Sequence, residues 1–152
     1  MTPSTLRQAV VADRVGWVRQ MLADARALPL DNYEAFIADR RNVAAAESYL
    51  RRALEGLLDL GRHLLAKGFG KAVPEYKQIS QELTKCEVLN RNQGSKLRTL
   101  AGYRNRMVHF YHEISNRELY RICTEDLGDI GDVLETILQW IRDHPEKIDN
   151  AL

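Results

Sequence analysis

One long stretch of helical periodicity constrains the fold of this chain more than any other feature. Between residues 43 and 65, apolar side chains fall repeatedly three, four or seven positions apart: Val43, Leu50, Leu54, Leu57, Leu58, Leu64 and Leu65. This spacing places them on one face of an α-helix. Asp31 and Glu34 resemble a capping box at the start of that helix, and the Gly-Phe-Gly sequence at residues 68–70 marks its end. The sequence therefore predicts a long amphipathic helix whose apolar face other helices cover.

Shorter periodic stretches predict the helices that cover it. They lie at residues 3–28, 76–86, 95–108 and 124–141, with a short helix at residues 116–122. The chain shows no convincing β-strand, internal repeat or low-complexity linker. These features predict an all-α fold, a bundle of four long helices plus a short one, in a single domain over residues 1–152 with its core at about residues 31–141.

Polar caps and prolines set the expected helix boundaries. Thr2 followed by Pro3 is typical of a helix start, and Ser95 and Thr124 stand where hydroxyl side chains cap two later helices. Pro145 is expected to end the last helix, which leaves a frayed tail at residues 145–152.

Composition excludes several classes of protein. The two cysteines, Cys86 and Cys123, lie far apart and outside any CxxC pattern, so they suggest neither a zinc site nor a disulfide framework. No apolar run approaches the roughly 18 to 20 residues that span a bilayer, and the N-terminus does not resemble a signal peptide. The expectation is a cytoplasmic protein in a reducing compartment.

Charge is distributed unevenly, although the formal net charge is only +1. Seven Lys or Arg residues and two Glu residues lie between residues 91 and 121, whereas residues 122–152 contain eight acidic and two basic residues. Either the two segments form helix faces that pair with each other, or the basic segment forms a patch that faces phosphate. The sequence leaves both interpretations open.

The segment GYRNRMVHFY at residues 102–111 carries the most chemistry. On an ideal helix, five steps rotate by about 140°, so Arg104 and His109 do not share a face, whereas Asn105 and His109 do. Arg104 and His109 meet one phosphate if the helix ends or distorts near His109, if two copies meet across a dimer axis, or if the long arginine reaches round.

An arginine and a histidine suffice to cleave RNA without a metal, because the ribose 2′-hydroxyl is the nucleophile. His109 would move the proton near neutral pH, and Arg104 would stabilise charge on the phosphoryl oxygens. Spacing alone is weak evidence, because it also fits a hydrogen-bonded core histidine at position 109 and a packing residue at Tyr111.

The surrounding residues resemble the signature of the HepT-like ribonuclease toxins of the HEPN superfamily. In that signature a glycine and an aromatic residue precede Arg-Asn, and apolar residues, Val-His, any residue and Tyr follow. The matching positions are Arg104, Asn105, Val108, His109 and Tyr111. Residues 52–55 and 58–63 are similar to the family's long second helix, and the resemblance covers about residues 31–141. Arg106 and Phe110 depart from the signature, which commonly has an apolar or small residue and an acidic residue there.

The resemblance implies a bundle that dimerises, with two Arg-His motifs forming one RNA cleft. It implies a metal-independent ribonuclease that acts as the toxin of a toxin–antitoxin pair, in which Arg104 stabilises phosphate, His109 is general acid and base, and Asn105 orients His109 or binds phosphate. It also implies an antitoxin nucleotidyltransferase that transfers AMP to Tyr111. In the rival interpretation the chain is a non-catalytic helical subunit that binds a nucleotidyltransferase, and Arg104 and His109 only hold the interface.

Other histidine and aromatic residues are expected to have structural rather than catalytic or metal-binding roles. His63 and Tyr76 fit structural positions in helices, and His109, His112 and Glu113 lack the spacing of a familiar zinc site. The chain contains no P-loop and no GxGxxG motif. The sequence therefore predicts neither a metal nor a cofactor.

Overall fold

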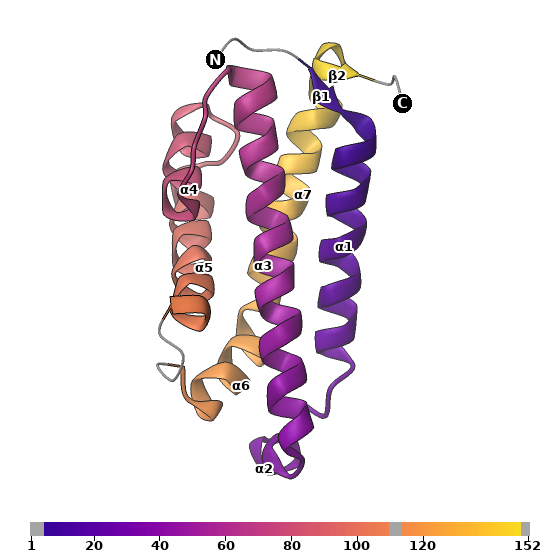
Figure 1. Cartoon of the computed structure of the whole chain (residues 1–152), viewed down its shortest axis with the longest axis vertical. Coiled ribbons are helices and arrows are strands. Elements are labelled where there is room, and N and C mark those ends of the chain that lie inside the picture. Colours follow the sequence, from indigo (N-terminus) through magenta and orange to yellow (C-terminus); the bar gives the residue numbers. More distant parts are fainter. Residues whose placement is uncertain (1–4, 110–113, 150–152) are drawn as a thin grey trace.

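The leucine-rich stretch folds into α3, a 30-residue helix (Arg40–Phe69) against which the other long helices pack (Figure 1). The computed structural model describes residues 5–109 and 114–149. Seven of the leucines of α3 are fully buried: Leu50, Leu54, Leu57, Leu58, Leu60, Leu64 and Leu65. The predicted apolar face of this helix is thus confirmed as the centre of the core.

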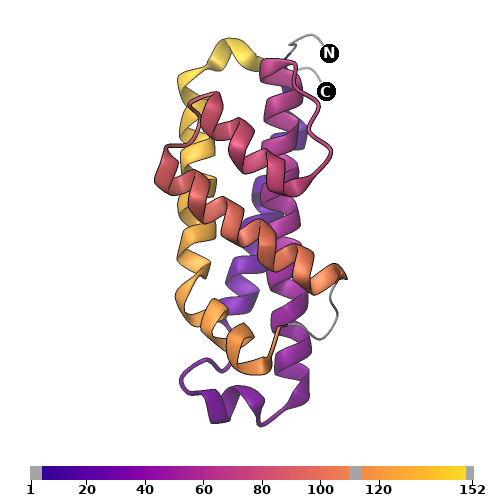
Figure 2. The ribbon, with the colours of Figure 1, turned by 90° about the vertical axis from the view of Figure 1, so that its left-hand side faces the viewer.

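Four long helices and three shorter ones make up the described part of the chain. The long ones are α1 (Gln8–Arg26), α3, α5 (Arg91–His109) and α7 (Leu127–Asp143), and the shorter ones are α2 (Tyr33–Ile37), α4 (Tyr76–Lys85) and α6 (Asn116–Glu125). Helix α1 lies along one side of α3, and α4 and α5 lie across the opposite side, with α7 packed against α1, α3 and α5 (Figures 1 and 2). The predicted all-α bundle is confirmed.

The long helix begins later than predicted, because the chain breaks at Ala38 and Asp39 into α2 and α3. The Asn32 side chain, rather than Asp31, caps α2 by accepting a hydrogen bond from the Ala35 amide at 2.8 Å. The Asp39 side chain caps α3 through the Arg41 amide at 2.9 Å. The break turns α2 so that its Phe36 is fully buried, 5.4 Å from the ring of Tyr120 between ring centres.

The two ends of the described chain pair with each other, which the sequence did not predict. Strand β1 (Leu6–Arg7) lies parallel to β2 (Ile148–Asp149), which follows a 3-10 turn at Pro145–Lys147. Helix α1 therefore starts at Gln8, so the predicted helix from Pro3 onward is wrong at Leu6 and Arg7, which form a strand. The expectation that the chain contains no strand is also wrong, as is the expected fraying over residues 145–149. Leu6 is fully buried, and this burial offsets part of the cost of ordering both ends.

Two further caps also differ from prediction. Asn90 and Gln93 cap α5 reciprocally, each side chain accepting from the other residue's amide at 2.8 and 3.0 Å, so the helix starts before Ser95. Thr124 lies inside α6, where its hydroxyl donates to the Tyr120 carbonyl at 2.9 Å, and α7 starts after Asp126. Polar residues that form caps also occur inside helices, where their side chains bond to the preceding turn.

Part of the basic segment pairs with the acidic one. Lys96 on α5 lies 3.4 Å from Asp129, and Arg121 lies 3.5 Å from Asp126 and 3.6 Å from Glu125. The first interpretation of the charge pattern is therefore correct for these side chains. Within the described residues, no helix is long and apolar enough to cross a membrane.

Candidate active site

The last two turns of α5 border a pocket of about 420 Å³. Three of the predicted site residues, Arg104, Asn105 and His109, line this pocket together within one chain. The rest of its wall comes from α3, from the loop before α4 and from the start of α4: Arg62, Pro74, Glu75, Tyr76 and Lys77. Tyr111 lies outside the described residues.

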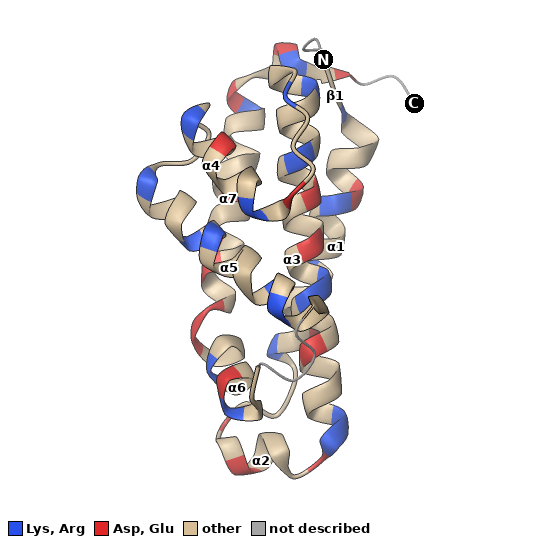
Figure 3. Cartoon of the chain, turned by 60° about the vertical axis from the view of Figure 1, so that its left-hand side comes forward, with Lys and Arg blue, Asp and Glu red and all other residues tan. Residues whose placement is uncertain are grey.

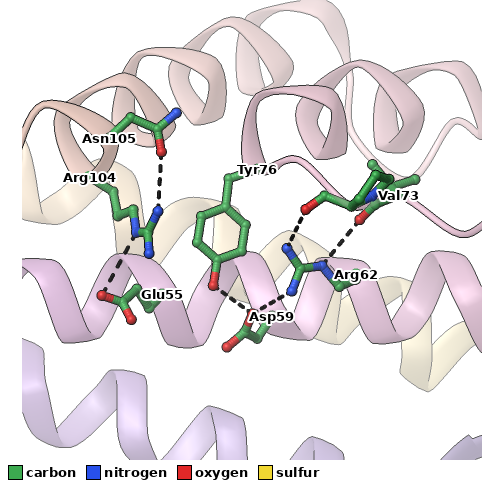
Figure 4. Close-up of polar contacts among 8 residues, drawn as sticks. Glu55, Asp59, Arg62, Val73, Tyr76, Arg104 and Asn105 are labelled. Carbon is green, nitrogen blue, oxygen red and sulfur yellow. Dashed lines mark hydrogen bonds and ion pairs between the residues drawn. The ribbon is translucent and has the colours of Figure 1, made fainter. Parts of the chain in front are cut away.

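Arg104 is held on several sides (Figure 4). Its Nη1 donates to Oδ1 of Asn105 at 3.3 Å, and its Nε lies 3.8 Å from Oε1 of Glu55 on α3. The guanidinium carbon is 4.6 Å from the ring centre of Tyr76, which is a cation–π distance. Glu55 also accepts a hydrogen bond from Arg51 at 2.9 Å, so two cations share this carboxylate. The Arg104 guanidinium is therefore oriented before any ligand binds.

Tyr76 lies between two arginines at the wall of the pocket. Arg62 is on one side at 4.7 Å and Arg104 on the other at 4.6 Å, both measured from the guanidinium carbon to the ring centre. The phenol donates to Asp59 at 2.8 Å. Burial, followed by this hydrogen bond, raises the pKa of Tyr76 to about 12, so the ring is neutral at physiological pH. The sequence placed Tyr76 in the core, but the residue is half-buried and borders the pocket.

Arg62 fixes the loop that delivers Tyr76 to this place. Its Nε and Nη2 donate to the carbonyls of Val73 and Pro74 at 3.1 and 3.0 Å, and its Nη1 donates to Asp59 at 3.4 Å (Figure 4). Gly70, which has the left-handed φ of 65°, ends α3 and starts the loop. Glu55, Asp59 and Arg62 lie in the stretches that resemble the family's long second helix. Their contacts with Arg104, Tyr76 and the loop were not predictable, because only the packing of α3 against α4 and α5 creates them.

His109 is the last residue of α5, and its side chain is exposed. It therefore does not occupy a core position, and the interpretation as a core histidine is wrong. Asn105, one turn earlier on the helix, has its carbonyl oxygen engaged by Arg104. The described contact of Asn105 is thus with Arg104 rather than with His109.

Arg106, which departs from the family signature, forms an ion pair away from the pocket. Its two terminal nitrogens donate to the two oxygens of Glu118 on α6 at 2.9 and 2.8 Å. This bidentate pair lowers the pKa of Glu118 and joins α5 to α6. Arg106 thus links α5 to α6. Phe110, the other departure from the signature, lies outside the described residues.

The remaining histidine and cysteine candidates fit structural positions. His63 accepts a hydrogen bond from the Arg7 amide at 3.2 Å through Nε2, and burial lowers its pKa, so its ring is neutral. Burial also raises the pKa of the Cys123 thiol to about 11, which makes it unreactive. Across residues 5–109 and 114–149, no group of three or more metal-binding side chains comes together, and His112 and Glu113 lie outside this part.

The helical bundle thus brings an exposed histidine and an oriented arginine to one pocket. Residues 18–137 match the family described as Ribonuclease HepT-like, and the chain belongs to this family. Comparison with curated protein sequences found no significant match.

Solved structures share the fold at low sequence identity. A tri-AMPylated HEPN toxin from Shewanella oneidensis, in complex with an MNT antitoxin, is 15% identical with a TM-score of 0.77, covering 86% of this chain and 97% of that one. A toxin–antitoxin structure with AMP-PNP is also 15% identical, with a TM-score of 0.76 and coverages of 84% and 97%. YutE, a cytosolic protein of unknown function from Bacillus subtilis, is 20% identical with a TM-score of 0.73, covering 90% of this chain and 92% of that one.

Proposed function

We propose that this chain is a metal-independent ribonuclease, and that it acts as the toxin of a toxin–antitoxin pair. The observation that carries the proposal is the pocket in which the exposed His109 and the oriented Arg104 lie together. Membership of the Ribonuclease HepT-like family supports the reaction class.

The proposed reaction is an attack of the ribose 2′-oxygen on the adjacent phosphorus. The bond to the 5′-oxygen of the next nucleotide breaks, and a 2′,3′-cyclic phosphate forms. His109 exchanges the protons of this step, since imidazole gives and takes protons near neutral pH. Arg104 stabilises the charge that develops on the phosphoryl oxygens, and its contacts with Glu55 and Tyr76 lower the reorganisation that this requires.

The proposed control is AMP transfer to Tyr111 by a partner nucleotidyltransferase. Its support is the family signature, in which Tyr111 stands two residues after His109, and the likeness in fold to a toxin described as tri-AMPylated and bound to an MNT antitoxin. The modification would place a negative charge and a bulky nucleotide next to the end of α5.

We also propose that the chain works as a homodimer with a shared RNA cleft. The pocket of one chain already contains the arginine and the histidine, so the support for a dimer is the family resemblance together with an exposed apolar side chain beside His109. That side chain is Val108, which is 41% exposed. Sedimentation should show a dimer at micromolar concentration, and a monomer with full activity would contradict the shared cleft.

Cleavage by the purified chain, free of its partner, tests the ribonuclease proposal. RNA should be cut in the presence of EDTA, and the products should carry 2′,3′-cyclic phosphate ends. Metal dependence with 3′-hydroxyl products would show that the assigned chemistry is wrong. Intact RNA would instead favour the non-catalytic subunit, which should still bind the nucleotidyltransferase.

Tyr76 should act as a positioning residue for Arg104. Tyr76→Ala removes the ring beside the guanidinium. Because a cation–π contact contributes about 0.5–2 kcal/mol, cleavage should slow by roughly two- to thirtyfold, mainly in kcat. Tyr76→Phe keeps the ring and should retain most of the rate. Single-turnover kinetics would measure both variants, and equal losses in the two would mean that the hydroxyl bond to Asp59, not the ring, is important.

A further inference from the structure

A second, larger hollow lies between α4 and α5, next to the proposed active site. Its volume is about 720 Å³, and its charged lining is entirely basic: Lys77, Lys85, Arg91 and Arg98. The other lining residues are glycine and uncharged polar side chains. Lys77 lines this hollow and also the pocket that contains Arg104 and His109, so the two are adjacent. We call the second hollow the basic groove.

The basic groove follows the two helices in a regular way. Arg91, Arg98 and Asn105 stand seven residues apart on α5, which places them on one face over about 21 Å. Lys77 and Lys85 stand eight residues apart on α4, also on one face. Figure 3 shows the blue segments that recur along α4 and α5. The row on α5 ends at Asn105, a residue of the site pocket.

Most cations of the groove lack an acidic partner, in contrast to those elsewhere on α5. Among the residues that the structure describes, Lys77, Arg91 and Arg98 form no ion pair, and Lys85 has only a contact of 3.6 Å with Glu82. The other cations of α5 each face a carboxylate: Lys96, Arg104 and Arg106. Three cations without a carboxylate partner thus line one hollow, together with Lys85 and with no acidic side chain among the described lining residues.

The floor of the groove is narrow and uncharged. Helix α5 approaches α4 so closely at Gly94 that a Cβ there would overlap the Thr84 hydroxyl. Ser80, also at the floor, is 2% exposed, and its hydroxyl donates to the Lys77 carbonyl at 3.1 Å. Among the described residues, no aromatic side chain lines the groove, so these residues offer no platform on which a base could stack. Cations on two rims above a neutral floor suit a chain of phosphates.

We propose that the basic groove binds the sugar–phosphate backbone of single-stranded RNA that extends from the cleavage site. This inference rests on the proposed function, which makes RNA the substrate of the adjoining pocket. Contacts to phosphate position a strand without reading its sequence, so the groove should increase affinity for long RNA with little dependence on sequence. A dinucleotide, which ends at the cleavage site, should not reach it.

Binding is tested with two double variants that lose the same charge. Both are made in a His109→Ala background, which prevents cleavage during the measurement. The groove variant is Arg91→Ala with Arg98→Ala, and the control is Arg26→Ala with Arg142→Ala, two exposed arginines on α1 and α7. The probe is a labelled single-stranded RNA of mixed sequence and about twenty nucleotides, titrated by fluorescence anisotropy at several salt concentrations.

The groove variant should bind this RNA on the order of tenfold more weakly at low salt. The slope of log affinity against log salt should be shallower by about 1.4, since each phosphate contact to a single strand contributes about 0.7. The control should bind like the parent. Equal affinity in the groove variant and the control, or no binding of RNA by the parent, would overturn the proposal.

A cleavage assay separates failure of the groove from failure of the proposed function. With His109 intact, the groove variant should cut a dinucleotide at the parent rate but lose kcat/KM on the longer RNA. If the groove variant cuts both the dinucleotide and the longer RNA as fast as the parent does, the ribonuclease proposal is supported and the proposal of the basic groove is wrong. If the parent cuts neither substrate but its RNA binding depends on Arg91 and Arg98, the proposal of the basic groove is supported and the ribonuclease proposal is wrong.

Discussion

His109→Ala and Arg104→Ala should each slow RNA cleavage on the order of 10³-fold while leaving the helical fold intact. The first variant removes the group that exchanges protons with the 2′- and 5′-oxygens. The second removes the charge that stabilises the phosphoryl oxygens. Because His109 is exposed, its truncation leaves no cavity. Initial rates on a labelled RNA, with circular dichroism for each variant, would measure both effects.

The contacts of Arg104 supply a finer control. In Arg104→Ala, Glu55 still accepts the hydrogen bond from Arg51 at 2.9 Å, so the negative charge of this partly buried carboxylate still has a positively charged partner. Arg104→Lys keeps the positive charge but loses the planar group that lies over Tyr76 and bonds to Asn105. Its rate should therefore fall between those of the parent and the alanine variant. A lysine variant as fast as the parent would show that charge alone suffices.

Modification of Tyr111 should have the second largest effect. The phenolic oxygen would attack the α-phosphorus of ATP, release pyrophosphate and retain AMP through a phosphodiester. That group would carry one negative charge, which would compete with an RNA phosphate for Arg104. Because Tyr111 follows His109 by two residues in the sequence, the nucleotide would also compete with RNA for space near His109. Coexpression with the cognate nucleotidyltransferase should add at least one AMP to the peptide that contains Tyr111 and remove most of the ribonuclease activity.

Tyr111→Phe provides the matching test, because it keeps the ring and removes the acceptor oxygen. The variant should still cleave RNA and should escape inhibition on coexpression. Mass spectrometry of the intact chain and a cleavage assay on the same sample would measure both properties. If the variant is modified and silenced as readily as the parent, control lies at another residue.

Local sequence patterns predicted the features that depend on neighbours along the chain. The buried leucine face of α3 was predictable, because a helix with one buried side has apolar residues at every third or fourth position. The end of α3 at Gly70 was also predictable, since glycine adopts the left-handed φ that this helix end requires without strain. The motif at residues 102–111 indicated Arg104, Asn105 and His109, and they line one pocket.

The sequence therefore determined the class of fold and the segment that contains the candidate site, while tertiary packing decided how that site is built. Arg104 is oriented by Glu55, which is 49 positions earlier, and by Tyr76, 28 positions earlier. The pairing of β1 with β2 likewise joins residues from opposite ends of the chain. Such contacts leave no local periodicity, because they form only after elements that are distant in the sequence have packed together. For the same reason, the position of the basic groove next to the site pocket, with Lys77 lining both, emerged only from the folded chain.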